Sequence, residues 1–355
     1  HFKRREPKTR PSQSDRTEAL DMNVDKQTRG YYVPGAKLEF LCSSAMAVYL
    51  EGRFRMFPAD GESADTIHFD FQAVMDPCEH VVERPQGDGK PFYEMPNGEA
   101  CYFREIDEAY LSFGDGLRAL CKFRSGRVLL SLVESEPRNL FVASHLALTI
   151  LLVEILKRRG WYSLHAAGFS ENGRAILIPG TSGVGKSTLS VALLRAKFDY
   201  LTDDMVFLRQ SSDGVVARGL IEDVDVSDQT IRFFPELDFL LQASKISGFP
   251  KKQVHVEEVY GTRIVAEAYP RAIVLPRISG KETSVITQIG SDEALLEIVP
   301  NVLLTEARAC QGHLSVLAEL VKQTACYRLD TGKDFDRIPA LLRGLLSCDH
   351  EAIYA

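Results

Sequence analysis

Two apolar segments joined by Asn-Gly, with a glycine-rich segment directly after the second, constrain this chain more than any other feature. The apolar segments are residues 163–169 and 175–179, and Asn172-Gly173 stands between them. Asn-Gly between two apolar runs is typical of a hairpin with a type I′ turn, because that turn needs positive φ at both central residues. The sequence therefore predicts a hairpin of two buried strands over residues 163–179.

The turn also fixes which residues of this hairpin face each other. With Asn172 and Gly173 as the loop, Glu171 faces Arg174. The same register, continued along both strands, sets His165 opposite Gly180. A histidine is therefore predicted to lie beside whatever begins at Gly180.

The segment that begins there has the complete G-x-x-x-x-G-K-[ST] pattern of a Walker A motif. It follows an apolar strand and precedes the helix-compatible residues 188–196, which is the context of a phosphate-binding P-loop. Backbone N–H groups of such a loop turn toward phosphate oxygens, Lys186 reaches the β/γ-phosphates, and the Ser187 hydroxyl ligates Mg²⁺. We therefore predict that ATP and Mg²⁺ bind here. The residues predicted to contact the nucleotide in this loop are Gly180, Thr181, Ser182, Gly183, Val184, Gly185, Lys186, Ser187 and Thr188.

Two adjacent carboxylates, Asp203 and Asp204, follow the next apolar stretch, residues 198–201. A right-handed crossover from the strand at 175–179 places the carboxyl ends of both strands at the same edge of the sheet. Both aspartates are therefore expected to face the P-loop. One carboxylate is needed to hold Mg²⁺ with Ser187, and a second can accept the proton of an attacking hydroxyl. The alternative is a solvated Asp pair in a turn.

The order of His165, the Gly-Val-Gly-Lys-Ser loop and Asp203-Asp204 resembles the catalytic domain of HPr serine kinase/phosphorylase and its relatives. Those enzymes share a P-loop core similar to that of phosphoenolpyruvate carboxykinase, and the resemblance covers about residues 161–210. It implies that Asp203 is the catalytic base, that Asp204 binds Mg²⁺ with Ser187, and that His165 helps to set the charge of the active site. With Lys186, these residues are the predicted catalytic and metal-binding groups.

The remainder of the chain is more similar to HprK-related kinases than to the HPr enzyme itself. The features in that direction are Leu164-His-Ala-Ala-Gly168, the stretch 251–261 and the stretch 268–277. Thr188 stands where the HPr enzyme usually has Glu. Relatives of this second kind include kinases that modify serine on ribosomal peptides. Two basic residues in these stretches, Lys252 and Arg277, are predicted to neutralise charge on the transferring phosphoryl group.

The chain as a whole is expected to be an α/β protein in three parts. Residues 1–30 are polar and are predicted to form a mobile tail. Residues 31–160 are predicted to form a smaller, antiparallel β-rich domain with short strands such as 37–41, 47–50 and 66–71, ending in a buried helix near 140–157. Residues 161–355 are predicted to form the P-loop kinase domain, completed by amphipathic helices over 314–346.

Composition excludes several classes of partner. A net charge of −7 gives no global attraction to nucleic acid or to an anionic membrane. The longest apolar run, residues 140–156, is interrupted by Ser144, His145 and Glu154 and favours a buried helix over a membrane span. Seven scattered cysteines without C-x-x-C spacing, and no signal peptide at the start, favour a reducing, cytoplasmic location. The sequence leaves open whether the protein forms an oligomer.

The function that these features favour is an ATP- and Mg²⁺-dependent kinase that phosphorylates a hydroxyl, with serine of a peptide or protein as the preferred acceptor. Phosphoryl transfer requires mainly positioning and charge neutralisation, which this set of residues supplies. A small-molecule hydroxyl kinase would use the same residues. A nucleotide-switched binding protein would need the P-loop but no free carboxylate beside the γ-phosphate.

Overall fold

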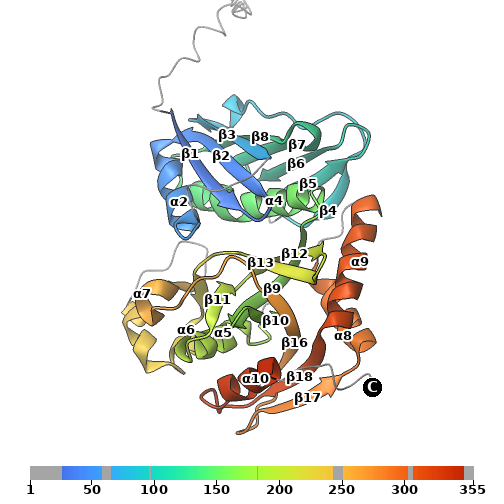
Figure 1. Ribbon diagram of the computed structural model, residues 1–355. Coiled ribbons are helices and arrows are strands. Elements are labelled where there is room, and N and C mark those ends of the chain that lie inside the picture. The colour runs from blue at the N-terminus through green and yellow to red at the C-terminus, as the bar shows by residue number, and fades with distance from the viewer. Residues whose placement is uncertain are drawn as a thin grey trace, which may run out of the picture.

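The computed structural model describes residues 26–57, 65–95, 97–181, 183–242, 251–302 and 307–347. Two large sheets, one above the other in Figure 1, form a mixed α/β fold. The upper sheet comprises residues before 134 and the lower sheet comprises residues after 161, with a long apolar helix between them in the chain.

The upper sheet has eight strands in the order β1-β2-β3-β8-β7-β6-β5-β4. These strands are β1 (Lys26–Val33), β2 (Ala36–Ser43), β3 (Thr66–Val74), β4 (Lys90–Tyr93), β5 (Gly98–Phe103), β6 (Glu108–Phe113), β7 (Leu117–Lys122) and β8 (Arg127–Val133). Helix α2 (Ser44–Phe54) and the short helices η1 (Pro77–Glu79) and η2 (Phe123–Ser125) connect them.

This sheet is mixed rather than antiparallel, because β2–β3 and β3–β8 are parallel pairs. The residues 47–50, predicted as a strand, lie in α2, and this helix gives the chain the crossover that a parallel β2–β3 pair requires. Its N-terminus is capped by Ser43, whose hydroxyl accepts a hydrogen bond from the Met46 N–H at 3.1 Å.

The first strand also begins earlier than the sequence indicated. β1 starts at Lys26 and pairs along its whole length with β2, so residues 26–30 belong to the sheet and not to a tail. These residues are polar because β1 is an edge strand, which is held by main-chain hydrogen bonds and needs few buried side chains. Residues 1–25, the rest of the predicted tail, lie outside the described residues.

The apolar helix predicted near 140–157 spans Pro137–Lys157 as three segments, α3 (Pro137–Val142), a π-helical turn η3 (Ala143–Ala147) and α4 (Leu148–Lys157). By length and composition it could cross a membrane, but 78% of its most apolar window is buried inside the protein. Its end carries a buried ion pair, in which Lys157 donates to Glu154 at 2.6 Å.

The lower sheet runs β13-β12-β9-β10-β16-β18-β17, with β11 paired to β9. Its strands are β9 (Tyr162–Glu171), β10 (Arg174–Pro179), β11 (Asp199–Thr202), β12 (Met205–Ser211), β13 (Gly214–Leu220), β16 (Tyr269–Ile278), β17 (Val285–Ile289) and β18 (Ala325–Thr331), and a separate pair joins β14 (Val224–Val226) to β15 (Lys252–Val254). Its helices are α5 (Lys186–Arg195), α6 (Asp228–Ile231), η4 (Pro235–Gln242), α7 (Val256–Tyr260), α8 (Ser291–Ile298), η5 (Val299–Asn301), α9 (Ala307–Gln323) and α10 (Ile338–Ser347).

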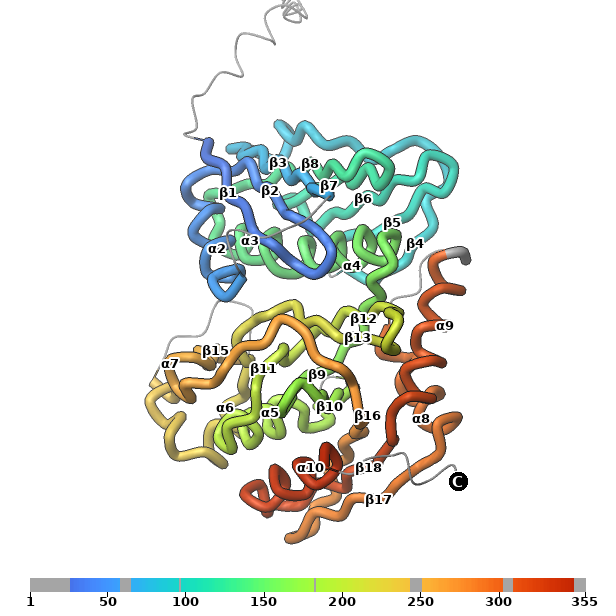
Figure 2. The backbone as a smooth tube through the Cα atoms, viewed as in Figure 1, coloured from blue at the N-terminus to red at the C-terminus, as the bar shows by residue number. Residues whose placement is uncertain are grey.

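Both faces of this sheet are buried, which explains the continuous apolar sequence of β10. Ile176 and Ile178 join one core with Leu189 of α5, whereas Ala175 and Leu177 join the core on the other face. The tube view in Figure 2 shows α5 and α10 near one another and α8 and α9 together elsewhere. Residues 314–346 were predicted to form amphipathic helices, but they also contain β18, a short strand between α9 and α10.

Candidate functional site

The hairpin of β9 and β10 has the register that its turn predicts. Arg174 pairs with Glu171 and Pro179 pairs with Ala166, so His165 is next to the loop that starts at Gly180. Asn172 and Gly173 have φ of 54° and 77°, as a type I′ turn requires. The local turn chemistry therefore positions a histidine at the start of the glycine-rich loop, defined here as residues 180–187.

The crossover after this loop also has the predicted geometry. β10 and β11 both pair antiparallel with β9, so they are parallel to each other with β9 between them. Their carboxyl ends consequently lie at one edge of the sheet, where the glycine-rich loop and Asp203-Asp204 follow. β16 and β18 are parallel to β10 as well, and the loops after them begin at this edge.

The glycine-rich loop is built by residues in left-handed backbone conformations. Gly183 and Gly185 have φ of 93° and 101°, which side chains with a Cβ rarely adopt. Helix α5 starts at Lys186 directly after Gly185, so the first N–H groups of the helix point toward the loop. A loop of this form with a helix N-terminus favours anions. Ser182 lies outside the described residues.

Lys186 is buried within the loop and connects it to His165. Its ammonium donates to the carbonyls of Gly180 and of Thr181, the latter at 3.3 Å, and to His165 Nε2 at 3.0 Å. Burial lowers the pKa of Lys186, an effect that the charges of Asp203 and Asp204 oppose. Because an ammonium only donates, Nε2 of His165 is the acceptor and Nδ1 carries the proton.

That proton is directed at Asp204, whose Oδ1 lies 3.1 Å from His165 Nδ1. The side chain of Asp204 is 51% exposed. Desolvation would raise the pKa of Asp204, but the hydrogen bond from His165 and the charge of Lys186 lower it below its ordinary value. Asp204 is therefore an ionised, solvent-accessible carboxylate held by a histidine.

Asp203 points the other way, into the protein. It is 7% exposed, lies 3.3 Å from the Ser187 hydroxyl through Oδ2, and accepts a hydrogen bond from the Ser190 hydroxyl through Oδ1. Burial raises the pKa of Asp203 to about 6, although the Ser190 hydrogen bond opposes the rise. The carboxylate next to Ser187 is thus Asp203, while Asp204 is the one next to His165.

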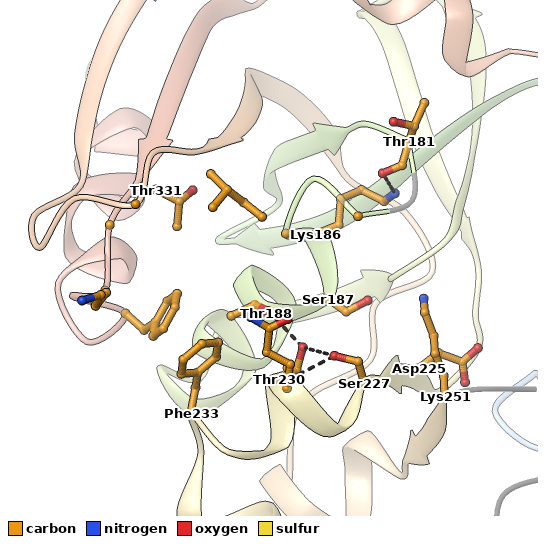
Figure 3. A pocket seen from close by; sticks show the side chains of 18 of the residues that line it. Thr181, Lys186, Ser187, Thr188, Asp225, Ser227, Thr230, Phe233, Lys251 and Thr331 are labelled. Carbon is orange, nitrogen blue, oxygen red and sulfur yellow. Dashed lines mark hydrogen bonds between the residues drawn. The ribbon is translucent and has the colours of Figure 1, made fainter.

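A pocket of about 430 Å³ opens in front of Lys186 and Ser187 (Figure 3). Its walls come from the glycine-rich loop, from β14 and α6, and from the loops after β16 and β18. At one end Phe233 and Phe335 have ring centroids 4.9 Å apart. Thr188 lines the pocket and lies within hydrogen-bond distance of Thr230, 3.1 Å away, which ties α5 to α6. A pocket with a phosphate-type loop at one end and aromatic rings at the other suits a nucleotide.

Most, but not all, of the predicted binding residues line this pocket. Thr181, Gly183, Gly185, Lys186, Ser187 and Thr188 do so. Gly180 and Val184 pack against each other instead, since a Cβ on Gly180 would approach Val184 Cγ2 to 2.7 Å. Three predicted catalytic or metal-binding residues do not line the pocket: Asp203, Asp204 and His165. Asp203 contacts Ser187, His165 contacts Lys186, and Asp204 is connected to Lys186 through His165.

The two predicted basic residues are not placed at the pocket. Lys252 is buried in β15, where its ammonium donates to the Leu241 carbonyl at 3.0 Å and pairs with Asp228 at 3.4 Å. Arg277 is exposed near the end of β16 and does not line the pocket, although Ile278 does. Lys251, which the sequence analysis did not select, is the lysine of that pair that lines the pocket. Lys252 is the first residue of β15 and is buried, whereas Lys251 directly precedes the strand and is exposed.

Comparison with known proteins adds little to this geometry. No protein-family model and no curated protein matches the chain. Among solved structures, the Hpr(Ser) kinase/phosphatase from Coxiella burnetii matches over 52% of this chain and 87% of its own, with 14% sequence identity and a TM-score of 0.29. A similarity at this level carries no argument about activity, so the assignment of function depends on the site itself.

Proposed function

We propose that this protein is an ATP- and Mg²⁺-dependent kinase that transfers the γ-phosphoryl group of ATP to a hydroxyl. The observation that carries the proposal is the meeting of three groups at one sheet edge. These groups are the Lys186 ammonium in a glycine-rich loop, the Ser187 hydroxyl beside the buried carboxylate of Asp203, and an exposed carboxylate, Asp204, held by His165. Phosphoryl transfer needs a phosphate cradle, a metal site and a group that orients the acceptor, and each has a candidate here.

The oxygen donors of Ser187 and Asp203 fit Mg²⁺, which prefers carboxylates and hydroxyls and retains several waters. The raised pKa of Asp203 supports this fit, because a buried carboxylate between two hydroxyl groups is stabilised by a divalent ion. When bound, Mg²⁺ neutralises charge on the β- and γ-phosphates. We therefore assign Asp203 to the metal and Asp204 to the acceptor, the opposite order to the one that the family resemblance implied.

In this assignment the residues act mainly by position. When a nucleotide binds, the Lys186 ammonium exchanges the Gly180 and Thr181 carbonyls for phosphate oxygens, and its contact with His165 keeps the imidazole in the tautomer that donates to Asp204. Asp204 then orients the acceptor hydroxyl and takes its proton as the hydroxyl oxygen bonds to the γ-phosphorus and the bond to ADP breaks. Phe233 and Phe335 are assigned to the base of the nucleotide, which stacks on aromatic rings.

A nucleotide-switched binding protein is the rival account, and Asp204 argues against it. A switch needs the loop and the metal ligand, but gains nothing from a second ionised carboxylate fixed by a histidine at the phosphate site. The test is incubation with γ-labelled ATP and Mg²⁺ in the presence of cell extract. A kinase transfers label to a phosphomonoester, whereas a switch releases it slowly as inorganic phosphate or not at all.

A further inference from the structure

The pocket in front of the glycine-rich loop has a third side, which β14 and the residue before β15 form. Asp225 and Lys251 line the pocket there. Figure 3 shows these two residues beside each other, on the side of the pocket away from Phe233, with the Lys251 side chain extended toward the glycine-rich loop. With the base on the aromatic rings and the phosphates on the loop, this third side is left to the end of the triphosphate.

The place of Lys251 follows from the packing of β14 and β15 on α5. The two strands pair antiparallel, and their valines lie in the same core as Leu189 of α5. The strand pair therefore packs against the helix whose first turn carries Ser187. Lys252 is buried and pairs with Asp228, whereas Lys251 is exposed. The strand pair thus brings an exposed lysine to the pocket that Ser187 also lines.

The ammonium of Lys251 is available to a ligand. It makes no hydrogen bond or ion pair with any residue in the described ranges, whereas Lys186 is held by carbonyls of the glycine-rich loop. Asp225 does not cancel its charge, because burial raises the pKa of Asp225 to about 7, against the opposing charge of Lys251, and leaves this carboxyl only partly ionised at neutral pH. Lys251 therefore gives up no ion pair when it turns to an anion.

The charge of Lys251 also reaches the groups that we assign to the reaction. Burial is the main influence on the pKa of Asp203, of Asp204 and of Lys186, and the charge of Lys251 acts on all three as well, lowering each pKa. Such an effect requires that the ammonium lie near these side chains. In the proposed reaction the γ-phosphoryl group lies among the same side chains, so Lys251 is close to the place where negative charge moves.

We propose that Lys251 binds the γ-phosphoryl group and neutralises the charge on its oxygens during transfer. The inference rests on the proposed kinase function. In that step the acceptor oxygen bonds to the γ-phosphorus, the bond from this phosphorus to the β–γ bridging oxygen breaks, ADP leaves, and the hydroxyl proton passes to Asp204. No bond to Lys251 forms or breaks. Because its ammonium touches the oxygens of the transferred group, Lys251 is a catalytic residue that acts by charge.

The first experiment measures, by calorimetry with Mg²⁺, the binding of ADP and of a non-hydrolysable ATP analogue to the full-length protein. Lys251→Gln should raise the Kd of the ATP analogue about 10-fold and leave the Kd of ADP within about twofold, because only the analogue carries a γ-phosphoryl group. Equal changes for the two ligands, or none, would overturn the inference and leave the kinase proposal intact. If the wild type binds neither ligand, the kinase proposal itself is wrong.

The matched control is Lys281→Gln. Lys281 lines the pocket from the loop after β16, and this loop is joined to the loop that carries Phe335 by a hydrogen bond from the Lys333 N–H to the Glu282 carbonyl at 3.2 Å. Lys281 therefore belongs to the side of the pocket that we assign to the base. Any change in Lys281→Gln should be the same for ADP and for the ATP analogue.

The second experiment separates a catalytic role of Lys251 from a structural one. With γ-labelled ATP at saturation, Mg²⁺ and cell extract, Lys251→Gln should lower the rate of label transfer by about 10²-fold or more. Lys251→Arg keeps the charge and should recover most of that loss. Urea unfolding of both variants should match the wild type, because the side chain is exposed and unpaired among the described residues. A wild-type rate in Lys251→Gln, or equal losses in the two variants, would overturn the inference.

Discussion

The hydroxyl of Ser187 lies 3.3 Å from the carboxylate of Asp203, whereas the adjacent Asp204 faces the His165 ring at 3.1 Å. Two consecutive carboxylates thus occupy different environments, one buried beside a hydroxyl and one exposed beside an imidazole. Alternation of side chains across the end of β11 separates them. The predictions below follow from this separation and from the pocket in front of it.

Asp203→Asn should abolish Mg²⁺-dependent ATP binding, because it removes the charge that we assign to the metal. Asp204→Asn should leave ATP binding within about twofold and reduce transfer by roughly 10²–10⁴-fold, the usual contribution of a positioned base. Thermal-shift titration with ATP and Mg²⁺ measures the first effect and labelled transfer measures the second. If Asp204→Asn loses Mg²⁺-dependent binding and Asp203→Asn keeps it, then Asp204 is the metal ligand and Asp203 the base, as the family resemblance implies.

Asp203 should also make stability depend on pH when Mg²⁺ is absent. Its folded-state pKa of about 6 is above the ordinary value, so the folded protein retains a proton that the unfolded chain loses. The free energy of unfolding therefore falls as pH rises from about 4 to about 6 and stays lower above that window. Asp203→Asn should increase stability near neutral pH by on the order of 1–2 kcal/mol in EDTA, and by much less near pH 4. Denaturant unfolding at both pH values measures this, and an equal effect at both would contradict it.

The hairpin and the aspartate pair could be predicted because their placement is local. Asn172-Gly173 sets the register that brings His165 to the loop, and one crossover of about 20 residues brings Asp203 and Asp204 to the same edge. What each aspartate touches could not be predicted in the same way. The orientation of Asp203 depends on Ser190, one turn into α5, and that of Asp204 depends on His165, two strands earlier. No short-range sequence pattern connects these residues with the aspartates.

The other walls of the pocket depend on long-range pairing. β14 pairs with β15 across an interval that includes α6 and η4, and this pairing decides that Lys251 rather than Lys252 faces the pocket. Phe233 and Phe335 come from segments far apart in the sequence that the sheet brings together. The mixed upper sheet was missed for a related reason, because the apolar run 47–50 fits a strand as well as the buried face of a helix.

Lys186→Ala should greatly reduce the stabilisation by ATP, since its ammonium lies inside the glycine-rich loop, in contact with the Gly180 and Thr181 carbonyls, where it can turn to a bound phosphate. We expect at least a 10-fold rise in the Kd for ATP, as measured by calorimetry. Lys322→Ala is the matched control, because Lys322 is exposed on α9 and pairs only with Glu319 among the described residues. Unchanged affinity in Lys186→Ala would refute the assignment of the loop to phosphate.

Phe233→Ala should weaken ATP binding by about 10-fold and leave the binding of tripolyphosphate unchanged, because only the base stacks on the ring. The comparison of the two ligands in one variant separates base contacts from general loss of structure. An equal loss for both ligands would place Phe233 in the support of α6 rather than in a base site.

Arg53→Ala should destabilise the whole molecule by about 3 kcal/mol, since it leaves Glu222 without its buried partner. The guanidinium also donates to Thr149 at 2.6 Å and to the His145 carbonyl at 2.8 Å, which joins α2 to the apolar helix. Arg29→Ala removes an exposed pair with Glu51, which solvent screens, and should cost much less stability than Arg53→Ala. Equal effects in the two variants, measured by urea unfolding, would contradict this interpretation.

The most direct test of a kinase at this site is the fate of the γ-phosphoryl group in the wild type and in Asp204→Asn, measured side by side with γ-labelled ATP, Mg²⁺ and cell extract. The account predicts label in an acid-stable phosphomonoester with the wild type, and its loss by 100-fold or more in Asp204→Asn at unchanged ATP affinity. Label recovered only as inorganic phosphate, or equal transfer by both proteins, would contradict it.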